Sequence, residues 1–462
     1  MRLLEIILVI MTILCSVLWI MRKGTARLKF LLTLATGVLG VVQLLVEGYR
    51  TPMLPMYILL GGLLIYAGIC WWRPVISPAK RGVLRGFLVV FFVCYLLLAA
   101  TLPLLLPVFQ LEKPVGPFAV GTKSFSWKYY SDGKIADSVV TEETVLTAQF
   151  WYPAKLVNGG QAVPYATAQT LHAAAEESGI PDFVVDNLKL VKTAAVQDAP
   201  VASRKVSYPV IIFTPGERVP VLAYSGMLQD LASRGFIVVS IGVVEPRLEA
   251  SLVTSQRTAD RAVSGFWLPK ISFVLDHLEQ VNQDTQGKEV LAGKLDLQHI
   301  GILGHSYGGT AIPLALQQDT RLKAGIDMDG IFYGAAQINN GVGKPFLYMN
   351  TVSSRQGYSA QVIGGGETQY QAYREILARR SAVLKHGGYE LTINGILHLG
   401  FSDFDRYSPV MALFNSLDQT QADTIISSYA SGFFQQYLEQ EPSSLLVPGS
   451  QPFPQAILRQ EG

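Results

Sequence analysis

The chain has 462 residues, half of them hydrophobic, and a formal net charge of +2. Residues 1–113 carry eleven Lys/Arg against three Asp/Glu, a balance of +8, so residues 114–462 carry −6. A globular part with negative net charge argues against a nucleic-acid-binding protein, which needs a basic surface.

Four apolar stretches open the chain: residues 3–21, 31–46, 53–72 and 87–109. Glu5 is the one charged residue in them. The first, third and fourth can each cross about 30 Å of hydrocarbon as a helix, and the second can do so with residues 28–30 included. We therefore expect four transmembrane helices. The alternative for the first stretch is a cleaved signal peptide, but its apolar run exceeds the roughly 7–15 residues of such peptides.

The loops between these stretches predict an orientation. Residues 22–29 and 73–85 carry four Lys/Arg each, whereas the other flanks carry only Arg2, Arg50 and Lys113. By the positive-inside rule both basic loops face the cytoplasm. The N-terminus and everything after about residue 113 then lie outside the cytoplasm.

Composition along the chain predicts three regions: a membrane domain over 1–113, a globular domain over 114–440 and a loose Pro/Ser-rich tail over 441–462. Within the globular domain, β-prone runs at 118–130 and 144–151 flank a turn signal, Ser-Asp-Gly-Lys, at 131–134. A helical insertion, at about 158–200, follows them and is expected to cap the pocket or simply to pack. Cys15, Cys70 and Cys94 all lie in the membrane domain, so the globular domain has no disulfide and no Cys-based metal site.

From residue 209 onward, short apolar runs alternate with helical patterns. The strands are expected at 210–214, 236–241, 300–303, 324–328, 346–350 and 390–393, and the helices at 224–233, 257–283, 307–317, 370–384 and 422–439. Such alternation predicts an α/β fold, a mostly parallel sheet flanked by helices.

One of these strand-to-helix junctions carries a chemical motif. Residues 301–311 read GILGHSYGGTA, in which Gly304, Ser306 and Gly308 fit the pattern G-x-S-x-G. A strand entering this motif and a helix leaving it are the context of a nucleophilic serine on a tight turn. The alternative, a nucleotide-binding turn, lacks G-x-G-x-x-G and G-K-[ST]. Pro313 is expected to kink the helix that follows.

A nucleophilic serine needs a base and a group that orients the base, in the chain order Ser, Asp/Glu, His on this type of sheet. Two histidines follow Ser306. His398 lies just after the last predicted strand and is preferred over His386, which precedes that strand. For the acid, Asp329 lies past the end of its strand, where functional loops gather, and is preferred over Asp327.

At this point the residues resemble a known family, the platelet-activating-factor acetylhydrolases of the plasma and type II kind. Besides GHSYGG, the segments that carry the resemblance are GPFAVG (116–121), FWYP (150–153), PVIIFTPG (209–216), DLASRGFIV (230–238), GIDMDG (325–330) and HLGFSDF (398–404). The resemblance covers residues 114–439 and omits the four apolar stretches. It implies an α/β-hydrolase fold, a triad of Ser306, Asp329 and His398, and calcium-independent hydrolysis of short or oxidised acyl groups from phospholipids, without a cofactor or a metal.

The chain departs from this family at the loop after the strand 210–214. Where relatives carry His-Gly, it has Pro215-Gly216-Glu217. An oxyanion-hole donor is a backbone N–H, so the side chain can change without loss of the donor. Glu217 and Tyr307 are therefore the expected pair of donors, and a carboxylate at the mouth is expected to affect substrate choice.

The sequence thus predicts a multi-pass membrane protein whose extracytoplasmic domain is a serine ester hydrolase for short-acyl or lipid esters. We expect it to bind an ester or phospholipid-like substrate and the lipid bilayer. We expect no nucleic-acid partner. Because a fold does not determine a function, two alternatives stay open: a peptidase or acyltransferase on the same scaffold, and a non-catalytic protein with a degenerate hydrolase domain.

Overall fold

The structure, a computed structural model, divides the chain into two compact units. The first comprises Met1–Gln110, Pro164–Val191 and Arg406–Met411, and the second comprises Leu111–Val163, Lys192–Asp405 and Ala412–Gly462. The residues that it describes are 1–21, 24–72, 82–135, 138–156, 159–242, 256–283, 289–332, 335, 338–352, 354 and 367–461.

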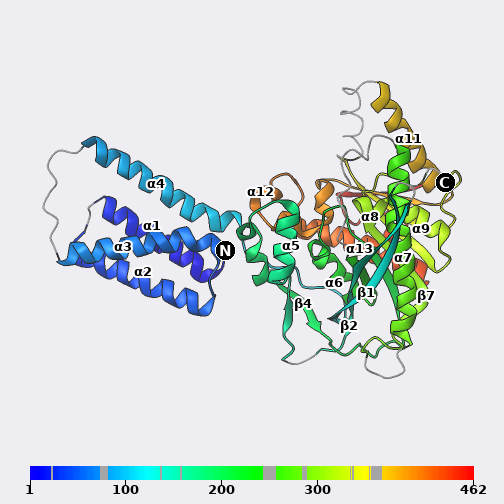
Figure 1. Ribbon diagram of the computed structural model, residues 1–462, viewed down its shortest axis with the longest axis horizontal. Coiled ribbons are helices and arrows are strands. Elements are labelled where there is room, and N and C mark those ends of the chain that lie inside the picture. Colours follow the sequence, from blue (N-terminus) through cyan, green and yellow to red (C-terminus); the bar gives the residue numbers. More distant parts are fainter. Residues whose placement is uncertain are drawn as a thin grey trace. The chain divides into compact units, whose positions relative to one another are not determined.

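Long apolar helices make up most of the first unit. They are α1 (Leu3–Ile20), α2 (Ala26–Val46), α3 (Leu54–Trp72), preceded by a 3₁₀ turn at Thr51–Met53, and α4 (Gly82–Leu105), drawn in blue in Figure 1. Small residues on α2 allow α3 to approach closely. A Cβ atom on Gly37 would lie 3.1 Å from Leu64, and one on Gly40 would lie 3.2 Å from Leu60.

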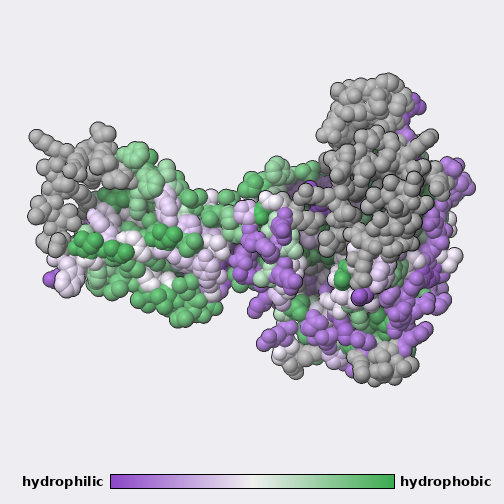
Figure 2. All heavy atoms as spheres, in the orientation of Figure 1, coloured by the Kyte–Doolittle hydropathy of each residue, from purple (hydrophilic) through white to green (hydrophobic). Residues whose placement is uncertain are grey.

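Three helical segments in the described part are long and apolar enough to cross a membrane: Leu3–Ile20, Ala26–Val46 and Thr51–Trp72. Figure 2 shows mostly hydrophobic atoms on the visible surface of these helices. The fourth predicted span lies in α4, whose apolar segment Val89–Leu105 is shorter. The fourth span therefore stays a prediction. Of the predicted cytoplasmic loops, residues 22–23 and 73–81 lie outside the described residues.

A buried ion pair joins the ends of these helices on the side of the N-terminus. Arg50 contacts both carboxylate oxygens of Glu5 at 2.9 Å, and both side chains are fully buried. Arg50 also donates to the carbonyl oxygens of Pro103, at 3.3 Å, and Leu106, at the C-terminal end of α4. A cation there complements the negative end of the helix dipole.

The first unit also contains most of the segment predicted as a cap insertion of the hydrolase domain. It forms α5 (Ala168–Ser178) and the 3₁₀ turns Asp182–Val184 and Asp186–Leu190. The predicted helical character does not continue to residue 200. Lys192–Gln197 is a strand, because buried Thr193 and Ala195 alternate with exposed neighbours and residues 195–197 pair with β1.

The second unit is built on one sheet, which has eleven strands in the described residues, in the order β11-β10-β9-β8-β7-β5-β6-β2-β1-β4-β3. The strands are β1 (Ala119–Ile135), β2 (Ser138–Ala154), β3 (Ala162–Pro164), β4 (Lys192–Gln197), β5 (Tyr208–Thr214), β6 (Ile237–Gly242), β7 (Leu295–His305), β8 (Leu322–Met328), β9 (Phe346–Thr351), β10 (Tyr389–Ile393) and β11 (Ala456–Gln460). From β10 to β6 every neighbouring pair is parallel. The predicted α/β architecture is confirmed.

Helices cover both faces of this sheet (Figure 1). The helices of this unit are α6 (Ser225–Ser233), α7 (Gln256–Asn282), α8 (Ser306–Thr310), α9 (Ile312–Gln318), α11 (Glu367–Leu384) and α13 (Gln419–Leu438), whereas α12 (Pro409–Ala412) belongs mostly to the first unit. On β5, Val210 and Ile212 share a core with α7, α9 and α11, whereas Ile211 and Phe213 share one with α6 and α13. A strand buried on both faces reads as a continuous apolar run, which is why VIIFT predicts a central parallel strand.

Two parts of the second unit differ from the sequence prediction. The hairpin is longer than predicted, since β1 and β2 remain paired from Ala119↔Ala154 to Ile135↔Ser138, beyond the predicted turn at 131–134. The tail, predicted to be loose, contributes β11, which pairs antiparallel with β10. Its residues AILRQ have the alternating burial of an edge strand, which the surrounding prolines obscure.

Candidate active site

The serine of the G-x-S-x-G motif lies on a sharp turn between β7 and α8. Ser306 has a left-handed backbone with φ of +52°, which is strained for a residue other than glycine. A Cβ atom on Gly304 would overlap the Thr214 hydroxyl, and one on Gly308 would overlap the backbone oxygens of Thr214 and Pro215. The helix after the turn breaks at Ala311, so the predicted effect of Pro313 is confirmed.

Three predicted side chains come together at the carboxyl edge of the sheet. Ser306 Oγ lies 2.8 Å from His398 Nε2, and His398 Nδ1 lies 2.7 Å from Asp329 Oδ2. The His398 side chain is 42% exposed, whereas that of Asp329 is 1% exposed. The carboxylate can therefore accept the Nδ1 proton from inside the protein, while the other face of the imidazole remains open to a substrate.

Asp329 is held by contacts that sequence reasoning missed. Its φ is +59°, and its Oδ2 accepts a second hydrogen bond from Ser354 Oγ, at 2.6 Å. The backbone N–H of Thr351 lies 3.4 Å from its Oδ1. The signal for these residues is that Thr351 ends β9 and Ser354 follows three residues later, at the same edge of the sheet as the end of β8. These contacts hold the Asp329 carboxylate in place independently of its contact with the imidazole.

The alternative acid, Asp327, lies on the other side of the turn. It is fully buried, accepts from Gly330 N at 2.9 Å, and lies so close to α8 that a Cβ atom on Gly309 would overlap its Oδ1. Burial raises the pKa of the Asp327 carboxyl well above its ordinary value, and the nearby Asp329 acts in the same direction. Side chains two residues apart share a face in a straight strand, but the left-handed backbone at Asp329 separates these two.

The other candidate histidine is remote from these contacts. His386 is followed by a glycine pair and its Nε2 lies 2.9 Å from Asn340 Oδ1, in an exposed hydrogen bond. The preference for His398 over His386 therefore agrees with the geometry.

Of the two predicted oxyanion donors, Tyr307 follows the serine in sequence, and Glu217 lies on a loop that packs against the serine. A Cβ atom on Gly216 would lie 3.2 Å from Ser306 Cβ, which places the 215–217 loop against the nucleophile. Tyr307 is the second residue of α8, so its backbone N–H lies at the amino end of that helix, directly after the nucleophile. The Glu217 side chain is exposed, so its charge is screened by water and acts weakly on a substrate. The role of both N–H groups stays a prediction.

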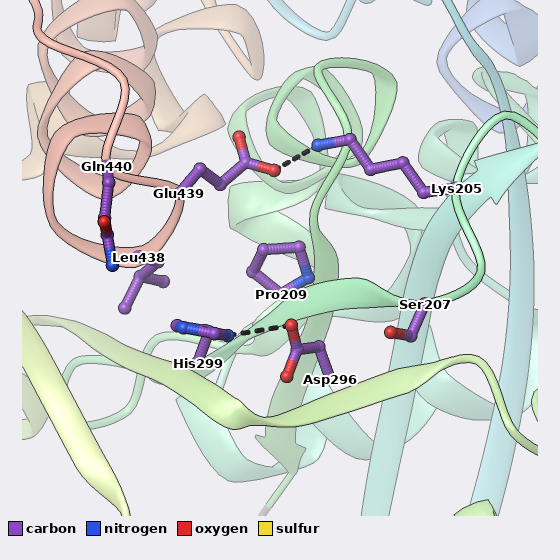
Figure 3. A pocket seen from close by; sticks show the side chains of 8 residues that line it. All are labelled: Lys205, Ser207, Pro209, Asp296, His299, Leu438, Glu439 and Gln440. Carbon is purple, nitrogen blue, oxygen red and sulfur yellow. Dashed lines mark hydrogen bonds and ion pairs between the residues drawn. The ribbon is translucent and has the colours of Figure 1, made fainter.

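A cavity of about 260 Å³ lies elsewhere in the second unit (Figure 3). Its lining includes Asp296 and His299 near the start of β7, and Pro209 near the start of β5. It therefore lies toward the amino ends of β5 and β7, whereas Ser306 follows the carboxyl end of β7. Figure 3 shows its charged groups already paired, Lys205 with Glu439 and His299 with Asp296. Among the described residues, no cluster of His, Cys, Asp or Glu could hold a metal ion.

Comparison with known proteins supports the same type of enzyme. A family profile described as Chlorophyllase matches residues 192–371. Platelet-activating factor acetylhydrolase of Cavia porcellus is 24% identical over 370 residues, which are 71% of this chain and 78% of that protein. A probable 1-alkyl-2-acetylglycerophosphocholine esterase of Arthroderma benhamiae is 29% identical over 156 residues, 30% of this chain and 36% of that protein.

A solved structure gives the fold. Ferulic acid esterase from Streptomyces cinnamoneus matches 77% of this chain and all of its own chain, with a TM-score of 0.57 and 21% identity. The chain has the α/β-hydrolase fold and is similar to the platelet-activating factor acetylhydrolases. The predicted fold and family resemblance are thereby confirmed, and the named relatives support an ester hydrolase. The family profile ends before His398, so it includes Ser306 and Asp329 but not the histidine.

Proposed function

We propose that this chain is a membrane-anchored serine hydrolase that cleaves short-acyl or lipid esters. The observation that carries the proposal is the hydrogen-bond chain from Ser306 Oγ through His398 to Asp329, with distances of 2.8 and 2.7 Å. These are the distances at which a base can take a serine proton. This series of hydrogen bonds ends at the buried carboxylate of Asp329, which Ser354 also holds, so the imidazole has one fixed orientation.

The reaction follows from this order of groups. Ser306 Oγ attacks the ester carbonyl carbon while its proton passes to His398 Nε2. The oxyanion that forms accepts hydrogen bonds from the backbone N–H groups of Glu217 and Tyr307. The C–O bond to the alcohol then breaks, and His398 returns the proton to the leaving oxygen. Water, deprotonated by the same imidazole, releases the acyl group and restores the serine.

Asp329 acts through the imidazole in both halves of the reaction. It accepts the Nδ1–H bond, which holds the tautomer whose Nε2 can receive the serine proton. It also stabilises the imidazolium that exists between proton transfers. Because the carboxylate is buried, this interaction is screened less than one in water.

The membrane part of the proposal rests on three apolar helices and on the charge of the loops. The basic loops lie at 22–29 and 73–85, which favours the cytoplasm for both and the extracytoplasmic side for the hydrolase domain. The protein is then a multi-pass protein of the cell membrane. Amphiphilic esters concentrate at a bilayer, so anchoring raises the local concentration of such substrates.

Short acyl groups are the proposed substrates because three relatives that match over 269 to 370 residues are named platelet-activating factor acetylhydrolases. A hydrolase for long chains gains about 0.8 kcal/mol for each methylene that it buries in an extended cleft. Without such a cleft, kcat/KM should not increase with acyl length.

The experiment measures kcat/KM of the purified full-length protein for p-nitrophenyl esters from acetate to dodecanoate, beside Ser306→Ala. We expect turnover of acetate to about hexanoate, a decline beyond that length, and a loss of at least about 1,000-fold in Ser306→Ala. Activity of Ser306→Ala equal to that of the wild type would refute the serine mechanism. A steady rise beyond about eight carbons would refute the short-acyl substrate but keep the mechanism.

A further inference from the structure

The residue before the nucleophile, His305, is a buried histidine that the reaction above does not use. It has no exposed surface, and both of its ring nitrogens have a partner. Nδ1 lies 2.7 Å from the hydroxyl of Tyr224, and Nε2 lies 3.0 Å from the backbone oxygen of His398. Its ring lies against that of His398, with 4.7 Å between the centroids.

The partners determine where the proton of His305 lies. A carbonyl oxygen only accepts, so Nε2 carries the proton and donates to His398 O. Nδ1 is then the acceptor, and the Tyr224 hydroxyl donates to it. The same hydroxyl oxygen accepts from the backbone N–H of Gly216, at 3.1 Å. When His305 is neutral, every donor and acceptor along this path has a partner.

This path connects two loops that the proposed reaction requires. At one end is Gly216, whose neighbour Glu217 is a proposed oxyanion donor. At the other end is the backbone of His398, the proposed base. Tyr224 and His305 lie between them, and both are fully buried. A shift of either loop by a few tenths of an ångström would break a hydrogen bond inside the protein, where an unpaired polar group is costly.

We propose that Tyr224 and His305 are positioning residues that hold the oxyanion loop and the backbone of His398 at a fixed spacing around Ser306. This inference rests on the proposed function and extends it to two residues that do not touch the substrate. Neither side chain can reach the reacting atoms, because its polar groups are occupied by the loops themselves.

The electrostatics of the site agree with this role. Burial lowers the pKa of His305 well below its ordinary value, and the neighbouring His398 lowers it further. A protonated His305 would lose the hydrogen bond from Tyr224. It would also place a positive charge beside the imidazolium that His398 becomes during the reaction, which would raise the energy of that state.

The first test compares Tyr224→Phe with Tyr208→Phe. Each change removes one buried hydroxyl, since Tyr208 is also fully buried and donates to Ala202 O at 3.0 Å, far from the active site in the chain. Tyr224→Phe should lower kcat about 10- to 100-fold, the cost of a small misplacement of reacting groups, and change KM by less than about twofold. Tyr208→Phe should leave both constants within about twofold. Equal kcat values for the two folded variants would overturn the inference.

The second test uses His305→Gln and His305→Leu. The Gln amide can still donate to His398 O, whereas Leu cannot, so His305→Gln should keep at least about five times more kcat than His305→Leu. The double variant Tyr224→Phe/His305→Gln should lose little more kcat than the more damaging single change, because both act on one path. Loss factors that multiply, or equal kcat for the Gln and Leu variants, would overturn the inference. If Tyr224→Phe does not fold, as judged by its melting temperature, the Gln/Leu comparison decides.

Failure of this inference can be told apart from failure of the proposed function. Ser306→Ala is measured in the same assay. If Ser306→Ala is inactive and Tyr224→Phe retains wild-type kcat, the serine mechanism is supported and the positioning role is refuted. If Ser306→Ala is as active as the wild type, the proposed function falls and this inference falls with it.

Discussion

At the end of β8, Asp327 and Asp329 lie in different environments although only one residue separates them. Asp329 turns outward through its left-handed backbone and meets His398, whereas Asp327 stays below the helix α8. The carboxylate of Asp329 has three hydrogen-bond partners, one of them the imidazole. One oxygen of Asp327, Oδ2, has none among the described residues. Position relative to a turn, and not residue type or burial, separates the aspartate that contacts His398 from the one that packs against α8.

The first prediction compares these two aspartates in the reaction. Asp329→Asn should lower kcat by about three to four orders of magnitude, because an amide no longer holds the productive tautomer of His398. Asp327→Asn keeps the shape of the side chain and should lower kcat by less than about tenfold. The measurement is kcat for p-nitrophenyl acetate. The opposite ranking would make Asp327 the orienting acid.

The second prediction concerns Asp327 and pH. Its pKa is raised in the folded protein, so between about pH 4 and the folded-state pKa the unfolded chain is ionised while the folded chain keeps the proton. The contribution of this group to stability is therefore present in full at low pH and is lost as the pH rises. Asp327→Asn cannot ionise, so its melting temperature relative to the wild type should increase from pH 5 to pH 8, by about 2 °C or more. A difference that does not change with pH, or that decreases, would contradict the assigned burial of a neutral carboxyl group.

The junction of β7 and α8 requires two backbone segments to approach each other closely. Gly308 of α8 lies against the backbone of Thr214 and Pro215, where any side chain would overlap a carbonyl oxygen. The glycines of the motif are therefore required by packing, and the strained serine is held between them.

The third prediction tests this requirement with two glycines in helices. Gly308→Ala should lower the melting temperature by about 5 °C or more, since overpacking against backbone costs about 1–3 kcal/mol or more. Gly265→Ala in α7 meets nothing within 4 Å and should leave stability unchanged or raise it by up to about 1 kcal/mol. Thermal unfolding followed by intrinsic fluorescence compares them. Equal melting temperatures would show that the turn has more room than these contacts indicate.

Several elements show how far the sequence alone can go. The central strands were predictable because they are apolar on both faces, as in VIIFT, and their helices follow with clear periodicity. The strands β4 and β11, near the two ends of the sheet, were not, because each buries only one face and its pattern is short. Pairing with a neighbour decides their conformation. Ser306, Asp329 and His398 were accessible through motif and chain order, whereas Ser354 and Tyr224 were not, since only the folded chain brings them to the site.

For the molecule as a whole, the first unit has the features of a membrane domain. Its helices are apolar outside, and its buried charges Glu5 and Arg50 satisfy each other. An isolated charge inside a bilayer is costly, so a paired one at the end of a helix bundle indicates a fixed arrangement of the helix ends. Because that end lies on the side of the N-terminus, it also lies on the predicted extracytoplasmic side.

The fourth prediction tests this orientation with single cysteines in a cysteine-free background. Val115 follows α4 and is 72% exposed. Val115→Cys should therefore react with a membrane-impermeant maleimide in right-side-out vesicles. Arg27→Cys, in the first basic loop, should react only after the membrane is opened. The reverse pattern would place the hydrolase domain in the cytoplasm, and reaction of both would contradict the membrane topology.

The most direct test of the central claim is to identify the residue that a fluorophosphonate probe modifies. The probe reacts with a serine only when a neighbouring base activates it. The full-length protein would be labelled, digested and mapped by mass spectrometry, with Ser306→Ala and Asp329→Asn beside it. We expect one adduct, on Ser306, which is absent in Ser306→Ala and forms far more slowly in Asp329→Asn. An adduct on another serine, or no adduct on folded wild-type protein, would contradict the central claim.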